Sequence, residues 1–213
     1  MTALEVVPIP NGAFSQNCYL VHPAGSREAA VVDPGEESDR VLREARSRGL
    51  DIRAIWLTHA HVDHIMGVAA VREATGAPVY LHPADRPLYD NLPAQALWFG
   101  LRLPAPPPPD HDLAHGDRLR LGDVELEVRH VPGHSPGHVV LVGPGCALVG
   151  DVVFAGSIGR TDLPGGDLDA LLGGIHREVL TLPDETVLYP GHGPVTTVGQ
   201  ERRANPFLGG QAG

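Results

Sequence analysis

The chain reads Thr58-His59-Ala60-His61-Val62-Asp63-His64 directly after an apolar run at positions 54–57. In an extended loop, alternate residues point the same way, so His59 and His61 can converge on one ion. Asp63 and His64 would then turn toward a neighbouring site. Imidazole and carboxylate ligands together suit Zn, Fe or Mn, whereas structural zinc sites are rich in thiolates. The stretch therefore predicts a centre built around two metals.

Three further residues share the local setting of this cluster. His134, Asp151 and His192 each follow an apolar segment that ends in a turn rich in glycine or proline. The turns read Val131-Pro132-Gly133-His134-Ser135-Pro136-Gly137-His138, Leu148-Val149-Gly150-Asp151 and Tyr189-Pro190-Gly191-His192-Gly193. Each residue alone can be an ordinary turn histidine or a surface aspartate, but loops on a rigid scaffold often carry function. Together with the first stretch they predict one metal cage.

The order of these motifs resembles that of the metallo-β-lactamase-fold superfamily over nearly the whole chain. Within it, residues 156–167 (GSIGRTDLPGGD), 201–208 (ERRANPFL) and 17–20 (NCYL) are similar to the short glyoxalase II-like proteins. The resemblance implies an α/β fold, an αββα sandwich in which two mixed β-sheets pack face to face with helices outside. It also implies one domain over residues 1–213, without the helical C-terminal domain with which full-length glyoxalase II binds glutathione.

The same resemblance implies which residues hold each metal. The ligands of metal 1 would be His59, His61 and His134. The ligands of metal 2 would be Asp63, His64 and His192, with Asp151 bridging the two ions. The expected cofactors are two divalent metal ions, either zinc or a mixture of zinc, iron and manganese. Asp63 and Asp151 are the expected catalytic residues.

The implied activity is thioester hydrolysis of the hydroxyacylglutathione hydrolase type, on a small-molecule substrate. Two divalent cations outweigh the charges of Asp63 and Asp151, which lowers the pKa of a bridging water toward neutrality. The metal-bridging hydroxide would attack the thioester carbonyl. The thiolate leaves without a general acid, because its thiol has a pKa of about 8.5. An amide would need such an acid, and the absence of an obvious candidate in the sequence favours thioesters over β-lactams.

Other functions remain open. Persulfide dioxygenases of the same superfamily share Gly159-Arg160-Thr161-Asp162 but bind a single iron. They tend to follow the last histidine with aspartate, so Gly193 at this position favours a hydrolase. A lactonase or general esterase is an alternative within the hydrolases. A non-catalytic metal-binding protein is disfavoured by the complete set of ligands.

The candidate substrate contacts lie outside the metal motifs. Arg160 and Asp162 follow Asp151 on a glycine-rich loop, where they can hold a substrate carboxylate or pair with each other. Trp98 lies within residues 91–116, a proline-rich segment that fits no regular element. This segment is either a surface excursion that buries Trp98 and Phe99 on the domain or one wall of the substrate groove.

Two side chains near His134 are not expected to act directly. His138 is expected to support a ligand or pack in the core rather than bind a metal. Residues 133–137 match the G-x-S-x-G motif of serine hydrolases, in which the N–H of the residue after the serine stabilises an oxyanion. That residue is Pro136, which has no N–H, so Ser135 is not expected to be a nucleophile.

The composition restricts the partners and the compartment. The net charge is −10 and no run of basic residues occurs, which argues against nucleic acid. No apolar segment approaches the roughly 18 residues of a membrane-spanning helix, and no signal peptide is recognisable. Cys18 and Cys146 match no metal or redox motif and are expected to be free buried thiols. These features predict a cytoplasmic protein, but none predicts its oligomeric state.

Apolar and amphipathic segments alternate as a layered α/β domain requires. Strands are expected near residues 4–7, 18–21, 29–32, 78–82, 119–121, 124–128, 139–142, 147–149 and 186–189. Helices are expected at 38–48, at 67–74 with His64 near the start, and after Asp167 as the N-cap residue.

Overall fold

A computed structural model describes residues 2–209, in which two six-stranded β-sheets pack face to face. The first sheet has the strand order β1 (Leu4–Asn11), β2 (Gln16–Pro23), β3 (Glu28–Val32), β4 (Asp51–Trp56), β5 (Val79–Leu81) and β6 (His111–Asp112). The strands from β1 to β3 are antiparallel neighbours, whereas those from β3 to β6 run parallel. The first sheet is therefore mixed, as predicted.

The second sheet is mixed as well. It has the strand order β14 (Thr196–Thr197), β13 (Val187–Pro190), β10 (Cys146–Gly150), β9 (Val139–Gly143), β8 (Val124–His130) and β7 (Arg118–Leu121). Strands β10 and β13 are parallel, and the other neighbours are antiparallel. A separate two-stranded ribbon pairs β11 (Val153–Phe154) with β12 (Ser157–Ile158).

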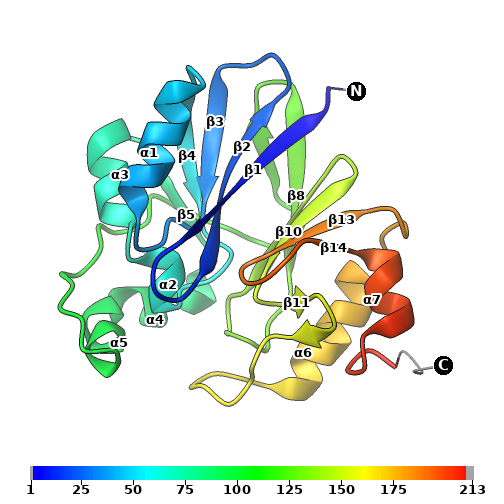
Figure 1. The fold of residues 1–213 in the computed structure, drawn as a ribbon. Coiled ribbons are helices and arrows are strands. Elements are labelled where there is room, and N and C mark those ends of the chain that lie inside the picture. Colours follow the sequence, from blue (N-terminus) through cyan, green and yellow to red (C-terminus); the bar gives the residue numbers. More distant parts are fainter. Residues whose placement is uncertain (1, 210–213) are drawn as a thin grey trace.

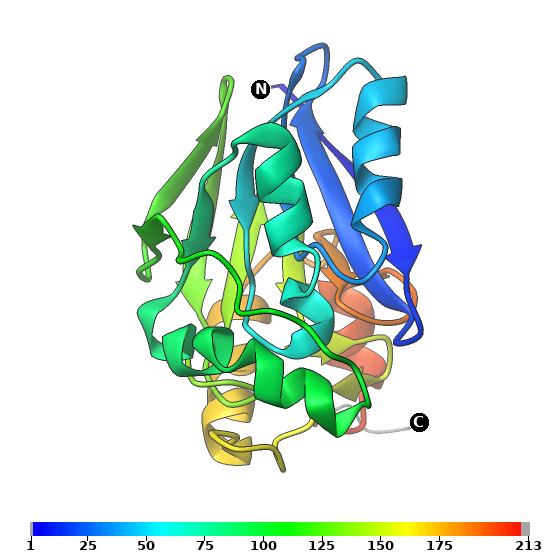
Figure 2. The same cartoon turned by 90° about the vertical axis from the view of Figure 1, so that its left-hand side faces the viewer.

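Helices lie on the outer side of each sheet (Figure 1). On the side of the first sheet they are α1 (Ser38–Ser47), α2 (Val62–Ile65), α3 (Val68–Thr75), the 3₁₀ turn η1 (Pro83–Asp85), α4 (Arg86–Asp90) and α5 (Leu92–Trp98). On the side of the second sheet they are α6 (Leu168–Gly174), the π-helical turn η2 (Ile175–Val179) and α7 (Val198–Ala204). Figure 2 shows α1 and α3 over the first sheet, with α4 and α5 across its lower end. The predicted αββα sandwich is confirmed. Within residues 2–209, none of these helices has the length and apolar character of a membrane span.

The alternation of side chains along single strands explains the layers. Successive residues of a strand point to opposite faces of the sheet. On β3, Val31 lies in the core beneath α1 and α3, whereas Val32 lies in the core between the sheets. On β10, Leu148 lies between the sheets and Val149 lies in the core beneath α6. Because both faces of these strands are covered, their sequences are continuous apolar runs.

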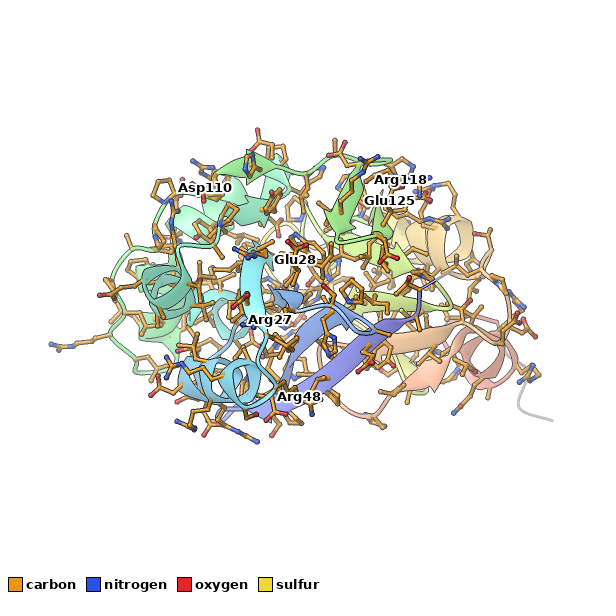
Figure 3. All side chains as sticks on the ribbon, turned by 90° about the horizontal axis from the view of Figure 1, so that it is seen from above. Arg27, Glu28, Arg48, Asp110, Arg118 and Glu125 are labelled. Carbon is orange, nitrogen blue, oxygen red and sulfur yellow. The ribbon has the colours of Figure 1, made fainter. Side chains whose placement is uncertain are left out.

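The two ends of the sandwich differ in character. The parallel strands β3 and β4 direct their carboxyl ends to the lower end in Figure 1, where α2 and β11 lie. In α/β folds, ligands tend to bind outside the carboxyl ends of such strands. The upper end, seen in Figure 3, carries exposed charges such as Arg27, which lies 3.7 Å from Asp51. Exposed ion pairs contribute little to stability.

Most of the predicted elements are present, and one prediction about their boundaries is wrong. The predicted N-cap residue Asp167 accepts a hydrogen bond from the Ala170 N–H at 2.9 Å at the start of α6. His64 was expected near the start of the helix at 67–74, but it lies in the separate short helix α2. Gly67 separates the two helices, because its N–H donates to the Pro34 carbonyl instead of continuing α2. This close approach to the turn after β3 requires glycine, since a Cβ at Gly67 would lie 2.2 Å from the Gly35 carbonyl oxygen.

The prediction that residues 91–116 fit no regular element is wrong for part of the segment. It contains the helix α5, with a proline in the first turn where a missing N–H costs nothing, and the short strand β6. The hypothesis that the segment buries its aromatic residues is also wrong. Trp98 is 66% exposed and Phe99 is 54% exposed.

Candidate metal centre

His59 and His61 lie in the loop that follows β4. Thr58 attaches this loop to the turn after β3, because its N–H and its hydroxyl donate to the Asp33 carboxylate at 2.7 and 2.6 Å. His61 has an extended backbone with φ −73° and ψ 151°, and α2 begins at the next residue, Val62. The loop is therefore fixed on both sides, and both imidazoles are buried.

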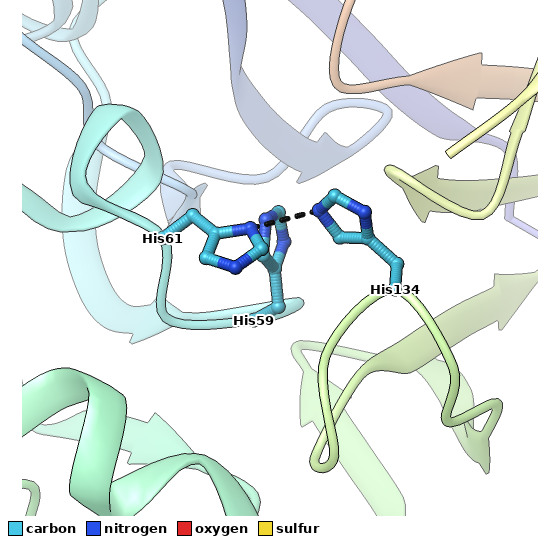
Figure 4. A group of neighbouring side chains, drawn as sticks. All are labelled: His59, His61 and His134. Atoms are coloured by element: carbon cyan, nitrogen blue, oxygen red, sulfur yellow. Dashed lines mark hydrogen bonds between the residues drawn. The ribbon is translucent and has the colours of Figure 1, made fainter. Parts of the chain in front are cut away.

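His59, His61 and His134 form the first cluster of the site (Figure 4). One ring nitrogen from each residue lies within 4.8 Å of the others, and His61 Nδ1 is 2.8 Å from His134 Nε2. His134 comes from the loop between β8 and β9 of the second sheet. The cluster thus joins the two sheets and brings together the three residues expected to bind metal 1.

Asp63, His64 and His192 form the second cluster. One potential ligand atom from each lies within 4.8 Å of the others. Asp63 Oδ2 is 3.0 Å from His192 Nε2 and 3.6 Å from His64 Nε2. His64 is buried in α2, whereas His192 follows β13 in the second sheet. The structure therefore also brings together the residues expected to bind metal 2.

Asp151 lies between the two clusters. Its Oδ2 atom is 3.5 Å from His134 Nε2 and 3.6 Å from His192 Nε2, and its Oδ1 atom is 3.4 Å from His64 Nε2. Burial raises the pKa of the Asp151 carboxyl, but these histidines outweigh burial and hold the pKa well below its usual range. The close approach requires glycine at position 191, since a Cβ there would lie 2.1 Å from Asp151 Oδ1.

The atoms at the centre of the site fit a divalent cation. His59 Nε2, His64 Nε2 and Asp151 Oδ1 are buried and have no hydrogen-bond partner among the described residues. Buried polar atoms without a partner are costly, and cations bound at the two clusters would satisfy all three. A set of imidazole nitrogens and carboxylate oxygens matches the preferences of zinc, iron and manganese.

Neighbouring groups hold two of the imidazoles in a defined orientation. His134 Nδ1 is 2.8 Å from the Arg160 carbonyl oxygen, which requires an N–H at Nδ1 and leaves Nε2 free to bind a metal. His64 Nδ1 is 3.1 Å from Asp33 Oδ2, which favours the same tautomer. Such partners orient metal ligands and increase their basicity.

The histidines of the two clusters have opposite pKa shifts. Burial and the neighbouring histidines lower the pKa of His59 well below its usual range and that of His61 to about 3. Burial also acts to lower the pKa of His64 and His192, but the carboxylates of the site outweigh it and raise both pKa values. His59 and His61 therefore lose their protons at lower pH than His64 and His192.

Asp33 is a residue that the sequence analysis missed. It lies after β3 with a left-handed φ of 51° and is buried. Asp33, His59 and His64 also place three potential ligand atoms within 4.8 Å of one another. Both Asp33 carboxylate oxygens already accept hydrogen bonds from Thr58, so we assign Asp33 to positioning the loop and His64 rather than to a metal.

Asp85 is a second residue that the sequence analysis missed. This buried carboxylate accepts hydrogen bonds from the Ala60 N–H at 2.9 Å, the Ser135 hydroxyl at 2.8 Å and the Gly137 N–H at 2.6 Å. Ala60 separates His59 from His61, and Ser135 follows His134. Asp85 thus joins the two loops that carry the first cluster.

Two side chains near His134 have supporting contacts. His138 Nε2 accepts a hydrogen bond from the Asp151 N–H at 3.0 Å, and its ring stacks on that of His59 at 4.7 Å. This geometry agrees with the expectation that His138 supports a ligand. The Ser135 hydroxyl is buried against Asp85, which agrees with the expectation that Ser135 is not a nucleophile.

The three candidate substrate contacts lie in different settings. Trp98 and Arg160 line the cavity beside the clusters, and Asp162 is absent from that lining. The Arg160 guanidinium donates two hydrogen bonds of 2.7 Å to the Asp162 carboxylate. Of the two alternatives left open by the sequence, the structure has these residues paired with each other.

Comparisons with known proteins agree with this fold and site. A family model described as Metallo-beta-lactamase superfamily matches residues 11–192. The chain belongs to the metallo-beta-lactamase superfamily. Among curated proteins, the chain is 37% identical over 209 residues to "Hydroxyacylglutathione hydrolase GloC" of Haemophilus influenzae. The match covers 96% of this chain and 97% of that protein.

Solved structures of other superfamily members are similar over almost their full length. The chain is 46% identical in sequence to the protein in the crystal structure of TTHA1623 in a di-iron-bound form, with a TM-score of 0.88. The match covers 95% of this chain and 100% of the TTHA1623 chain. The chain is also 40% identical to the BLEG-1 B3 metallo-beta-lactamase, with a TM-score of 0.91. This match covers 97% of this chain and 100% of the BLEG-1 chain. Together with the His/Asp clusters, these likenesses support a metal-binding hydrolase of the superfamily.

Proposed function

We propose that the chain hydrolyses thioesters, the activity type named for its relative GloC, at a centre of two divalent metal ions. The observation that carries this proposal is the position of Asp151, whose carboxylate faces ring nitrogens of both clusters. Metal 1 would be held by His59, His61 and His134. Metal 2 would be held by Asp63, His64 and His192, with Asp151 as the bridge. The ions would be zinc or a mixture of zinc, iron and manganese.

The residues around the centre have roles that follow from their contacts. When bound, the metals would supply Lewis acidity for hydrolysis at neutral pH. The Arg160 carbonyl accepts a hydrogen bond from His134 Nδ1 and orients this ring, and Asp33 orients His64. Asp85 keeps the two loops of the first cluster at a fixed separation. A thiolate whose conjugate acid has a pKa of about 8.5 leaves without a proton donor, so thioester hydrolysis requires no general acid from the protein.

β-Lactam hydrolysis is a second candidate, because the BLEG-1 structure is named a B3 metallo-beta-lactamase. An amide nitrogen must be protonated as it leaves. The acidic and imidazole side chains that line the cavity are His61, Asp63, His134, Asp151 and His192, all of them proposed ligands. Arg160 also lines it but keeps its proton at any physiological pH. Within the described part of the chain, this lining provides no uncommitted acid, which favours thioesters.

Metal analysis combined with substrate assays tests the proposal. We expect about two metal ions per chain and thiol release from lactoylglutathione or from simpler acyl thioesters. A chromogenic cephalosporin should be hydrolysed far more slowly than the best thioester. Elemental analysis measures the metals, and a thiol-reactive dye measures release. One iron per chain, oxygen uptake with a persulfide and no thiol release would instead identify a dioxygenase. Cephalosporin hydrolysis at a rate matching that of every thioester would favour the lactamase.

Acidification is expected to release the two metals in separate steps, metal 2 first. A histidine binds metal only as the neutral ring, so a raised pKa lets protons compete at higher pH. The pKa values of His64 and His192 are raised, whereas those of His59 and His61 are lowered. As the pH falls from 7, the metal content should therefore drop from two to one before it drops to none. Equilibrium dialysis at a series of pH values measures both steps.

Single-ligand variants identify which metal leaves in each step. His192→Ala should remove the step at higher pH and keep the step at lower pH, because only metal 2 loses a ligand. His61→Ala should do the reverse. Release of both metals in one step, or loss of the higher-pH step in His61→Ala alone, would contradict the proposed assignment.

A further inference from the structure

A cavity of about 610 Å³ opens beside the proposed metal centre, lined in part by His61, Asp63, Asp151 and His192. This volume falls within the range of about 300–1,000 Å³ that is typical of pockets for small molecules. A thioester bound here would place its carbonyl near the centre and extend its acyl group along the remaining walls.

The remaining walls are mainly apolar and come from separate parts of the chain. Phe14 lies between β1 and β2, Trp98 and Phe99 end α5, and Phe154 lies in β11. The rings of Phe14 and Phe99 pack edge to face with centroids 4.9 Å apart, which joins the β1–β2 turn to α5. The Phe154 ring lies 6.2 Å from the ring of His192, so the apolar wall reaches the proposed ligands.

The aromatic residues at the end of α5 remain exposed, Phe99 despite its contact with Phe14. Trp98 and Phe99 retain 66% and 54% of their surface in contact with solvent. Large apolar side chains that stay exposed around a cavity are typical of ligand-binding grooves. A ligand that covered them would gain the free energy of removing this apolar surface from water.

The basic side chain that lines the cavity is not free to bind a charged thiol carrier. Arg160 contributes the one guanidinium in this lining, and both of its hydrogen bonds go to the Asp162 carboxylate at 2.7 Å. The exposed carboxylates of a glutathione moiety would therefore meet no free guanidinium or ammonium group among the residues described at this cavity.

We propose that this cavity binds the acyl group of a thioester with an apolar chain, and that it gives no preference to a charged thiol carrier. The proposal rests on the proposed thioesterase function and specifies its substrate class. The apolar walls formed by Phe14, Trp98, Phe99 and Phe154 would cover the chain, and the metal centre would face the thioester carbonyl.

A series of thioesters with one uncharged thiol, N-acetylcysteamine, tests the acyl preference. Acetyl, butyryl, hexanoyl and octanoyl esters are compared by kcat/KM with the metal-loaded protein. Burying one methylene is expected to raise kcat/KM about two- to fourfold, so octanoyl, with six more methylenes, should exceed acetyl by roughly 60- to 4,000-fold. Octanoyl glutathione should be no better than octanoyl N-acetylcysteamine. A flat series, or lactoylglutathione exceeding the octanoyl esters by about tenfold, would overturn the proposal.

Variants of α5 link the preference to the cavity. Trp98→Ala and Phe99→Ala should each lower the octanoyl-to-acetyl ratio of kcat/KM, and the double variant should lower it by about tenfold or more. Leu97→Ala is the matched control, since Leu97 is 61% exposed on the same helix but lies outside the cavity lining. An unchanged ratio in the double variant, or an equal decrease in Leu97→Ala, would place the acyl site elsewhere.

Tryptophan fluorescence separates failure of the cavity proposal from failure of the thioesterase proposal. The two tryptophans are Trp98 in the cavity lining and Trp56, which is 1% exposed between the sheets. Octanoate should change the emission of Trp98 at lower concentration than acetate, and Trp98→Phe should abolish this change. If no thioester is hydrolysed but this response occurs, the thioesterase proposal fails and the apolar site stands. Hydrolysis without any chain-length dependence or fluorescence response refutes the apolar site alone.

Discussion

Replacing Asp151 by alanine is expected to abolish most of the hydrolytic activity and to lower the metal content. The Asp151 carboxylate lies within 3.6 Å of ring nitrogens from both clusters. Its removal takes away a negative charge that would compensate both cations. A loss of about 4 kcal/mol of transition-state stabilisation corresponds to roughly a thousandfold decrease in kcat/KM. Thiol release and elemental analysis on the same sample measure both effects.

A conservative variant and a distant variant define the controls. Asp151→Asn keeps the shape but removes the charge, so it should resemble Asp151→Ala in metal content if the charge is what matters. Asp169→Ala removes an exposed carboxylate on α6 and should change neither quantity. Near-normal turnover by Asp151→Ala at reduced metal loading would contradict the bridging role and leave Asp151 as one ligand among several.

The candidate ligands could be recognised from the sequence because their signal is local. His59 and His61 alternate in one loop, and His134, Asp151 and His192 each follow an apolar strand and a turn. The strands themselves were predictable because residues such as Val31 and Val32 face two different cores, which produces continuous apolar runs. Such patterns depend on neighbouring residues along the chain and need no knowledge of distant contacts.

The residues that position these ligands have no such local signal. Asp85 precedes a short helix and is separated by 50 residues or more from two of its hydrogen-bond partners, Ser135 and Gly137. Asp33 could not be recognised as a positioning residue, because its hydrogen-bond partner Thr58 lies 25 residues further along the chain. Trp98 and Phe99 were open to two interpretations because apolar residues are usually buried, and only their place beside the cavity explains their exposure.

Replacing Asp85 by alanine is expected to destabilise the protein and to weaken the binding of metal 1. The substitution leaves three donors without an acceptor, two N–H groups and the Ser135 hydroxyl, in a fully buried environment. With about 1 kcal/mol lost for each bond, the unfolding free energy should fall by about 3 kcal/mol, which corresponds to a Tm lower by on the order of 10 °C. Thermal unfolding of the metal-free protein measures this loss.

The positioning role of Asp85 is separable from its contribution to stability. Because Asp85 connects Ala60, between two ligands, to Gly137 near the third, the variant should bind metal 1 about 10- to 100-fold more weakly while still folded. Ser135→Ala is the matched control, since it removes one of the three bonds and should lower stability by about 1 kcal/mol with little change in metal affinity. Metal titrations well below the Tm of each variant make the comparison. A lower Tm in Asp85→Ala with unchanged affinity would show that the two loops keep their separation without this carboxylate.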